Sequence, residues 1–389
     1  MKITAIDTFA VRTDAIHPWM FCAIRTDEGL TGYSEFGDGQ QPRGLLGLVE
    51  DMSEGLIGQD PGPVERIYVD LYRRTRHMSG GPVAMAIAGI ELALWDLKGK
   101  ALGVPVCALV GGPYREQQQV YWSHLATYRS HLPEFFGGKQ LDGVEGIAAC
   151  AAEAKEKGFR AFKTNILFPG GDPPSLMQGF VGSDDQNAPT DLIRHATRQI
   201  AAMREAVGPD IDIALDINYH FKTSGAIRMA RAMEPYDLMW IEHDCQDARS
   251  LAQLKSSTTT PVCSGEQLVG VRQYLPFLER RAMDVVKIDV QWQGFSQAKK
   301  VADLAEIYEM NIAPHNYNSH LSSCQSVQLA ASVSNVRLLE LDVDPVPPWR
   351  DEITTSAPEL EADVMTVPTA PGWGCDLDEA AAQRYRWEG

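Results

Sequence analysis

From about residue 118 onward, short apolar runs alternate with amphipathic segments. A short apolar run indicates a buried β-strand, and apolar residues at every third or fourth position indicate a helix. The alternation predicts strands near residues 120, 162, 214, 240, 262, 286, 312 and 338. It predicts helices over residues 145–157, 191–206, 223–235, 246–257, 295–309 and 321–332. Eight strands that alternate with helices predict an α/β barrel.

The chain before about residue 115 lacks this alternation. Its patterns predict strands over residues 2–12 and 19–36, the latter divided by a turn at 27–29, and helices over 43–56, 62–76 and 83–101, the last ending at Gly103. The loop-rich end of the chain predicts a short helix over 377–385. We therefore expect an N-terminal α+β domain (1–115), a barrel (116–345) and a C-terminal segment that returns to the first domain (346–389).

Three of the predicted strands lead into a carboxylate. Asp216, Glu242 and Glu266 follow one another at intervals of 26 and 24 residues, which is the length of one strand and one returning helix. They are therefore expected at the C-terminal ends of neighbouring strands, where barrels place their catalytic groups. The alternative is that the three are unrelated surface carboxylates. All three, however, occur at the same position of the strand–helix repeat, which favours one shared site. Because converging carboxylates repel one another and oxygen donors suit a hard ion, the pattern favours a Mg²⁺ site.

The other predicted strands also end in polar side chains. Lys163 and Asn165 lie two residues apart, so they share one side of a strand. Asp289 and His315 are one strand–helix step apart, and a carboxylate bonded to one imidazole nitrogen leaves the other as a competent base. Glu340 ends the last strand. The alternatives are that Lys163 is a surface lysine, that His315 is a core histidine, and that Glu340 pairs with a nearby cation.

Composition limits the possible partners. A net charge of −17 over 389 residues argues against nucleic acid or an anionic membrane surface as a partner. Seven widely spaced cysteines do not form a disulfide pattern, and no apolar run approaches the roughly 18 residues of a membrane span. The N-terminus lacks the pattern of a signal peptide. We expect a cytoplasmic protein that acts on a small molecule.

Taken together, these motifs resemble the enolase superfamily and, within it, the mandelate racemase subgroup. The resemblance is carried by GIELALWDLKGKALGVPVCALVGG (89–112), KTN (163–165), the carboxylates at 216, 242 and 266, Asp289, PH (314–315) and LLE (338–340). It implies a modified (β/α)₇β barrel with an α+β capping domain built from both chain ends. It also implies one essential Mg²⁺, removal of a proton α to a carboxylate, and a homo-oligomer between dimer and octamer.

The resemblance gives the polar residues roles. Mg²⁺, Lys163 and a protonated Glu340 would stabilise the dianionic intermediate, and His315 backed by Asp289 would be the base. Two-base members of the subgroup carry a Lys-x-Lys pair, whereas this chain has Asn165 at the second position. Asparagine cannot take a proton, so dehydration is expected rather than racemisation. Either His315 or another group would then protonate the leaving hydroxyl; the candidates are Tyr219, His220, His243 and the polar loop 168–190.

The expected activity is therefore a Mg²⁺-dependent dehydratase of an aldonate or aldarate that releases a 2-keto-3-deoxy acid. The alternatives are a racemase/epimerase or lactone cycloisomerase that shares the proton-removal step, a binding protein without turnover, and a glycosidase with paired acids.

Residues near the barrel mouth are candidates for substrate binding. In the N-terminal domain these are His17, Trp19, His77 and Met78, and in the C-terminal segment Trp349 and Arg350 would close the pocket or clamp a carboxylate. His124, His220 and His243 are expected to be structural or to orient substrate.

Overall fold

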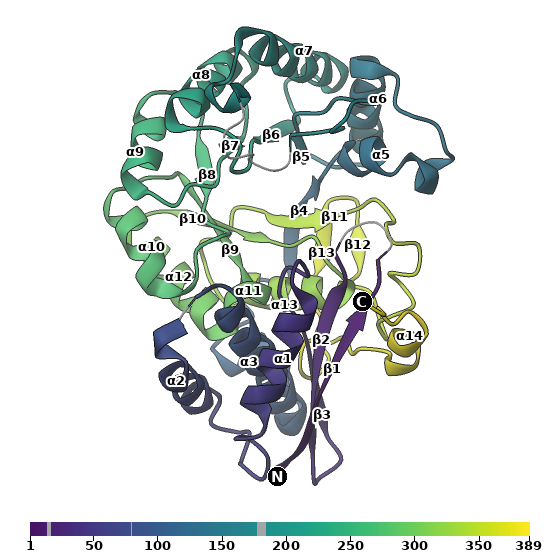
Figure 1. Ribbon diagram of the computed structural model, residues 1–389, viewed down its shortest axis with the longest axis vertical. Helices are drawn as coiled ribbons and strands as arrows, with labels where there is room; N and C mark the ends of the chain where they lie inside the picture. The colour runs from purple at the N-terminus through teal and green to yellow at the C-terminus, as the bar shows by residue number, and fades with distance from the viewer. Residues whose placement is uncertain (14–16, 79, 177–183) are drawn as a thin grey trace.

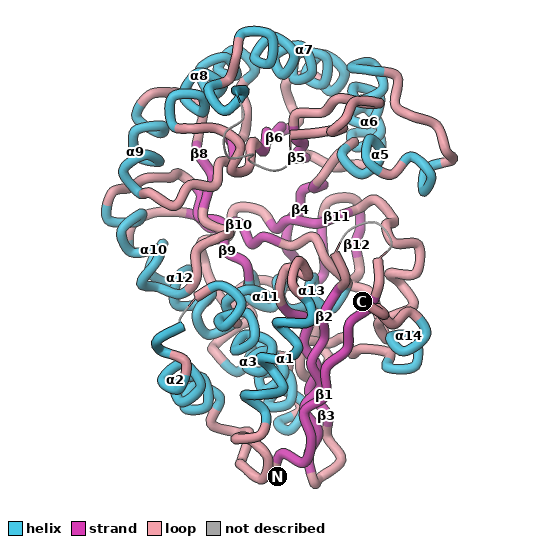
Figure 2. The backbone as a smooth tube through the Cα atoms, in the orientation of Figure 1, coloured by secondary structure: helices cyan, strands magenta, loops and turns pink. Residues whose placement is uncertain are grey.

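The computed structural model describes residues 1–13, 17–78, 80–176 and 184–389. Figure 1 shows the N-terminal elements in the lower half of the view and the strand–helix alternation arching over the upper half. The last residues run back beside the N-terminal strands (Figures 1 and 2).

A barrel of parallel strands forms the centre of the fold. Its strands are β4 (Gln117–Ser123), β5 (Ala161–Asn165), β6 (Asp212–Asp216), β7 (Trp240–Glu242), β8 (Val262–Ser264), β9 (Val285–Asp289), β10 (Asn311–His315) and β11 (Leu339–Asp342). Strands β4 to β10 pair in chain order, and β11 pairs with β4. A parallel bridge between Ile312 and Val336 joins β10 to the residues before β11 and closes the ring. The eight strands predicted from the apolar runs are confirmed.

Helices cover the outside of the barrel. They are α6 (Gly143–Glu156), α7 (Thr190–Val207), α8 (Thr223–Met233), α9 (Ala248–Ser256), α10 (Gly270–Glu279), α12 (Phe295–Ile307) and α13 (His320–Ala330). Short helices α5 (Thr127–His131) and α11 (Val290–Gln293) follow β4 and β9. The pattern did not predict α10, which carries Pro276 in its interior, a residue that normally breaks a helix.

The N-terminal part is an antiparallel sheet packed on helices. Strands β1 (Ile3–Val11), β2 (Trp19–Thr26) and β3 (Thr31–Phe36) form the sheet, and α1 (Pro42–Ser53), α2 (Val64–Arg74), the short α4 (Val106–Leu109) and the long α3 (Gly81–Leu102) accompany it. Helix α3 ends at Gly103, which has a φ of 69°. Its Glu91 accepts hydrogen bonds from the backbone nitrogens of Phe295 (2.8 Å) and Ser296 (2.9 Å) at the start of α12. These bonds fix α3 to the barrel.

The C-terminal segment contacts both the barrel and the N-terminal sheet. It contains β12 (Leu360–Glu361), β13 (Val364–Thr366) and α14 (Glu379–Arg384), and β13 pairs antiparallel with the first residues of β4. In α14, Glu379 accepts a hydrogen bond from Tyr33 at 2.7 Å and pairs with Arg25 at 2.9 Å. The segment therefore returns to the N-terminal domain. In the described residues the fold is the expected capped (β/α)₇β barrel.

The structure bears on two expectations from the sequence, which concern disulfide bonds and membrane-spanning segments. All seven cysteines are free thiols. Among the residues that the structure describes, no helix has the length and apolarity needed to cross a bilayer.

Candidate active site

The register of the barrel strands brings the predicted carboxylates to one edge. Asp216 pairs with Asn165 on β5 and with Glu242 on β7. Glu266 follows the end of β8, whose Cys263 pairs with Glu242. Neighbouring strands lie about 4.8 Å apart, so side chains at matching register positions gather at the barrel mouth.

Lys163 lies at the centre of these acids. Its Nζ is 2.9 Å from Oε1 of Glu242, 2.9 Å from Oε1 of Glu340 and 3.1 Å from Oδ2 of Asp216. Burial alone would lower the pKa of Lys163, but Glu242, Glu340 and Asp216 together outweigh it and raise that pKa well above its usual value. Lys163 is therefore a buried cation of the site and not a surface lysine.

A second buried lysine, Lys287, was missed by the sequence reasoning. It is fully buried in β9, and its Nζ lies 2.7 Å from Oε2 of Glu340 and 3.2 Å from Oε2 of Glu242. It also donates to the hydroxyl of Tyr121 at 2.5 Å. The signal that could have found it is its position two residues before Asp289, which puts both side chains on the inner side of the strand.

These two lysines change the expected state of Glu340. Burial would raise the pKa of Glu340, but Lys163 and Lys287 outweigh it and hold that pKa well below its usual range. Ser123 also donates to Glu340 at 2.5 Å. The arrangement therefore favours an ionised Glu340, which disagrees with the protonated Glu340 expected from the sequence. The reason is Lys287 on β9, a second buried cation that the expectation did not include.

The other carboxylates carry like-charge strain. Burial raises the pKa of Glu266 well above its usual value, and Asp244 and Glu242 add to the effect. Burial also raises the pKa of Asp216. Asp244 is buried, and among the described residues neither of its carboxylate oxygens has a hydrogen-bond partner. Such a cluster of buried oxygen donors is the chemistry that a hard divalent cation stabilises.

Three carboxylates of the site are grouped around the ammonium of Lys163 and not around one another. Within residues 1–13, 17–78, 80–176 and 184–389, no three His, Cys, Asp or Glu side chains converge closely enough to hold a metal ion. Lys163 lies between Asp216 and Glu242, and Glu266 faces His315, with 3.4 Å between Oε2 and Nε2. The oxygen donors fit Mg²⁺ in their chemistry, and Mg²⁺ binding would require the acids, two of which pair with Lys163, to draw closer together.

His315 and Asp289 form the pair expected from their spacing. They lie opposite one another on β10 and β9, and Nδ1 of His315 is 2.7 Å from Oδ2 of Asp289. Oδ1 of Asp289 accepts from the backbone nitrogen of Trp292 at 2.7 Å, which fixes the carboxylate. A carboxylate on Nδ1 sets the tautomer, so Nε2 is the nitrogen available as a base on the side of Glu266.

Asn165 is held by other polar side chains. Its Oδ1 accepts from Thr127 at 2.9 Å and its Nδ2 donates to Oδ1 of Asn218 at 3.2 Å. The amide therefore links the ends of β5 and β6, and it cannot carry a proton between substrate faces.

The predicted substrate contacts lie in different surroundings. His17 is exposed, whereas Trp19 is buried in β2. Trp349 stacks on Tyr385 with ring centres 5.0 Å apart, and Arg350 donates to the backbone oxygen of Asp342 at 2.8 Å. The stacking lies within the C-terminal segment, and the Arg350 bond joins that segment to β11. A role in substrate binding stays a prediction for all four residues.

The candidates for a second acid also differ. His220 is fully buried against Phe221. Nδ1 of His243 is 2.8 Å from the backbone oxygen of Asn218, and burial lowers the pKa of His243 to about 4, which makes it a poor proton donor at neutral pH. Tyr219 is 44% exposed. Part of the loop 168–190, residues 177–183, lies outside the described residues.

The loop after β3 contacts the segment that follows β9. The backbone nitrogen of Gly37 donates to the oxygen of Gln291 at 3.2 Å. Burial raises the pKa of Tyr317, beside His315, well above its usual value, and Asp38 adds to the effect. The N-terminal domain thus brings a carboxylate to the same space as the strand ends.

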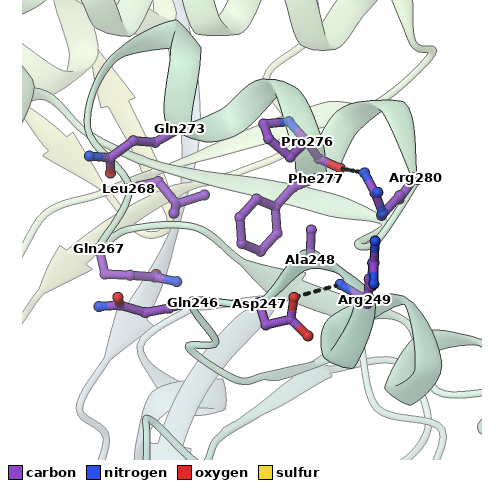
Figure 3. A pocket seen from close by; sticks show the side chains of 10 residues that line it. All are labelled: Gln246, Asp247, Ala248, Arg249, Gln267, Leu268, Gln273, Pro276, Phe277 and Arg280. Carbon is purple, nitrogen blue, oxygen red and sulfur yellow. Dashed lines mark hydrogen bonds between the residues drawn. The ribbon is translucent and has the colours of Figure 1, made fainter.

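A separate groove of about 400 Å³ lies on the outside of the barrel between α9 and α10. Figure 3 shows its lining, in which Gln267 neighbours Glu266 in the chain but none of the site carboxylates takes part. We place the chemistry at the barrel mouth because the buried charges converge there.

Comparison with known proteins agrees with this geometry. Residues 5–111 match the mandelate racemase / muconate lactonizing enzyme N-terminal domain family, and residues 146–381 match the enolase C-terminal domain-like family. The chain belongs to the enolase superfamily, in the mandelate racemase and muconate lactonizing enzyme subgroup.

The relatives include two acid-sugar dehydratases. The D-xylonate dehydratase of Haloferax volcanii is 31% identical over 100% of this chain and 90% of its own length. The D-galactonate dehydratase of Ralstonia nicotianae is 30% identical over 98% of this chain and 93% of its own length. A Burkholderia xenovorans protein solved with magnesium and fumarate, and provisionally named an L-alanine-DL-glutamate epimerase, is 34% identical with a TM-score of 0.92 and coverage of 99% and 96%.

Proposed function

We propose that this protein is a Mg²⁺-dependent dehydratase of an acid sugar, an aldonate or aldarate. It removes the proton α to the carboxylate and eliminates the β-hydroxyl, which yields a 2-keto-3-deoxy acid. The observation that carries the proposal is the His315–Asp289 pair, at 2.7 Å, facing a cluster of buried carboxylates. The acid-sugar dehydratases among its relatives support the substrate class.

Asp216, Glu242 and Glu266 would hold the metal ion. When bound, Mg²⁺ supplies positive charge to the substrate carboxylate and so lowers the energy of the enediolate. Burial, with Asp216 and Glu242, raises the pKa of Asp244 well above its usual value, and a bound cation would favour its ionised form. Lys163 would present its ammonium group to a substrate oxygen once it leaves the acids that it now contacts.

His315 would remove the α-proton through Nε2. Asp289 holds the ring and stabilises the imidazolium that forms. Glu340, kept ionised by two lysines, would hold Lys163 and Lys287 in place and would not donate a proton. Asn165 on the neighbouring strand offers no base, which favours elimination over proton transfer between two faces.

A racemase/epimerase or a lactone cycloisomerase is the second candidate. It shares the proton-removal step with the dehydratase. The Burkholderia xenovorans protein, which is provisionally named an epimerase and is similar to this chain, supports it. The two differ in whether water is lost.

Three further expectations stand as proposals. They are the domain boundaries near residues 115 and 345, a homo-oligomer between dimer and octamer, and a cytoplasmic location. The free cysteines support a reducing compartment. Light scattering coupled to size-exclusion chromatography would give the oligomeric state directly.

The test is a screen of aldonates, aldarates and uronates with Mg²⁺, read by semicarbazide detection of 2-keto acids. We expect at least one acid sugar to be converted, with activity lost in EDTA and restored by added Mg²⁺. Exchange of the α-proton in D₂O without any keto acid would move the isomerase to first place. If no acid in the library shows either α-proton exchange or keto acid formation, both functions are contradicted.

A further inference from the structure

The barrel mouth contains a second histidine–carboxylate pair. Nδ1 of His124, at the end of β4, lies 2.8 Å from Oδ1 of Asp342 in β11. Oδ2 of Asp342 accepts from the hydroxyl of Tyr128 at 2.5 Å, and its backbone oxygen accepts from Arg350 at 2.8 Å. Asp342 is thus fixed from three sides. This arrangement repeats that of His315 on Asp289.

The two pairs share one space. The ring of Tyr317 lies 5.1 Å from the ring of His315 and 6.1 Å from that of His124. Ser123, beside His124 in the chain, donates to Glu340 at 2.5 Å, so the pair adjoins the buried ion cluster. In the sheet, β4 lies between β11 and β5, the strand that carries Asn165. His124 therefore borders the position where two-base members of the subgroup carry their second lysine.

The outer nitrogen of His124 is available to a ligand. The side chain is 11% exposed, and within the described part of the chain its Nε2 makes no hydrogen bond. Its backbone has a φ of 50°, a conformation that non-glycine residues adopt infrequently and that recurs at functional sites.

The charges around His124 favour its protonated form. Burial would lower the pKa of His124, but Asp342 outweighs burial and raises that pKa above its usual value. Lys163 acts against protonation and Glu340 favours it. The hydroxyls of Tyr128 and Tyr317 face the ring, and both have pKa values raised by burial, so they stay neutral. His131 also interacts with the charge of His124, and burial together with His124 lowers the pKa of His131.

We propose that His124 is the general acid of the reaction and that Asp342 is its positioning residue. The proposal rests on the dehydratase function proposed above and supplies the proton donor that Asn165 cannot. It replaces our sequence expectation that His124 is structural or only orients substrate.

The proton balance closes with these two histidines. Neutral His315 takes the α-proton, the bond between the β-carbon and its hydroxyl oxygen breaks with the electron pair on oxygen, and His124 protonates that oxygen to release water. The enol that remains accepts a proton at the β-carbon from His315. Its hydroxyl proton returns to His124, so both residues regain their starting states.

The first experiment needs no substrate. The enzyme with Mg²⁺ is labelled with [¹³C]histidine and titrated by NMR, and the His124→Asn variant identifies the His124 signal. We expect a midpoint above about 6.5, the usual value for histidine, and a downward shift in Asp342→Asn. A midpoint below 6.5, or no shift in Asp342→Asn, would overturn the pairing whatever the enzyme's activity.

The second experiment separates a proton donor from a structural residue. With D-xylonate, D-galactonate or another acid sugar converted in the screen, His124→Asn should lower dehydration about 100-fold or more while α-proton exchange in D₂O stays within a few-fold of wild type. Elimination of fluoride from the 3-deoxy-3-fluoro analogue should be spared, because fluoride leaves without a proton. His131→Asn, a neighbouring histidine bonded to Ser175, is the matched control.

The outcomes are distinct. Unchanged dehydration in His124→Asn, or equal loss of dehydration, exchange and fluoride release, would overturn the general-acid role. If the wild type converts no acid sugar, the proposed function fails, and the NMR titration still judges the His124–Asp342 pair.

Discussion

The ammonium of Lys287 lies 2.7 Å from the carboxylate of Glu340, and both side chains are fully buried inside the barrel. Lys163 contacts the other oxygen of Glu340 at 2.9 Å. Buried carboxylates and buried lysines thus contact one another in the site, and the positive charge of the lysines offsets the negative charge of the carboxylates. A buried ion pair costs much more to break than a surface pair, because the remaining charge stays desolvated.

Lys287→Met should therefore destabilise the fold. It removes the cation from Glu340 and Glu242, and we expect a loss of about 3–5 kcal/mol in the free energy of unfolding, measured by urea denaturation. Lys300→Met is the matched control, because Lys300 pairs with Glu65 on the surface at 2.8 Å, and it should change stability by about 0–1 kcal/mol. Equal effects of the two substitutions would contradict the role of Lys287.

Magnesium should stabilise the folded protein. The ion would offset the burial of Glu266 and its repulsion by Asp244 and Glu242, which together raise the pKa of Glu266, so the thermal midpoint should rise with Mg²⁺ concentration and fall in EDTA. Glu266→Gln should weaken Mg²⁺ binding at least about tenfold by isothermal titration calorimetry. Glu279→Gln, an exposed glutamate in α10, should leave binding unchanged. A Glu266→Gln variant that binds Mg²⁺ as tightly as wild type would remove Glu266 from the ligand set.

Much of this site could be predicted from the sequence because parallel strands convert sequence intervals into neighbours. The intervals from Asp216 to Glu266 and from Asp289 to His315 each span whole strand–helix steps, and the structure places those residues at one barrel edge. Contacts across the barrel could not be read in this way. Lys287 on β9 and Glu340 on β11 lie two strand–helix steps apart, and that interval alone does not show that their side chains meet inside the barrel.

Other elements were obscured locally. Helix α10 was not predicted because Pro276 lies in its interior. The buried side chains of Phe277 and Leu278 nevertheless pack this helix against the barrel. The pairing of His124 with Asp342 could not be predicted, because Asp342 lies at the other end of the barrel domain in sequence and meets His124 only when β11 pairs with β4.

The stability of the protein should depend on pH through Glu35, which links the N-terminal domain to the barrel. Burial raises the pKa of Glu35 to about 7, although Ser319 and Ser322 donate hydrogen bonds to it. A raised folded-state pKa means that the folded protein binds this proton more tightly. Its stability contribution is therefore complete below about pH 4.5 and is lost as pH rises through about 7.

Glu35→Gln should flatten that part of the pH profile. The difference between the free energies of unfolding at pH 5 and pH 8 should shrink by about 3 kcal/mol relative to wild type, measured by urea denaturation. Glu50→Gln, an exposed change on α1, is the control and should keep the wild-type profile. A Glu35→Gln profile that matches wild type would mean that Glu35 titrates normally.

The most direct test of the central claim is one NMR experiment on the reaction at His315. Wild type, His315→Asn and the control His195→Asn, whose histidine lies on α7, are each incubated in D₂O with Mg²⁺ and an acid sugar found in the screen. We predict that wild type and His195→Asn lose the α-proton signal and form the 2-keto-3-deoxy acid, and that His315→Asn slows both by about 10²–10⁴-fold. Exchange and keto acid formation at wild-type rates in His315→Asn would contradict the account.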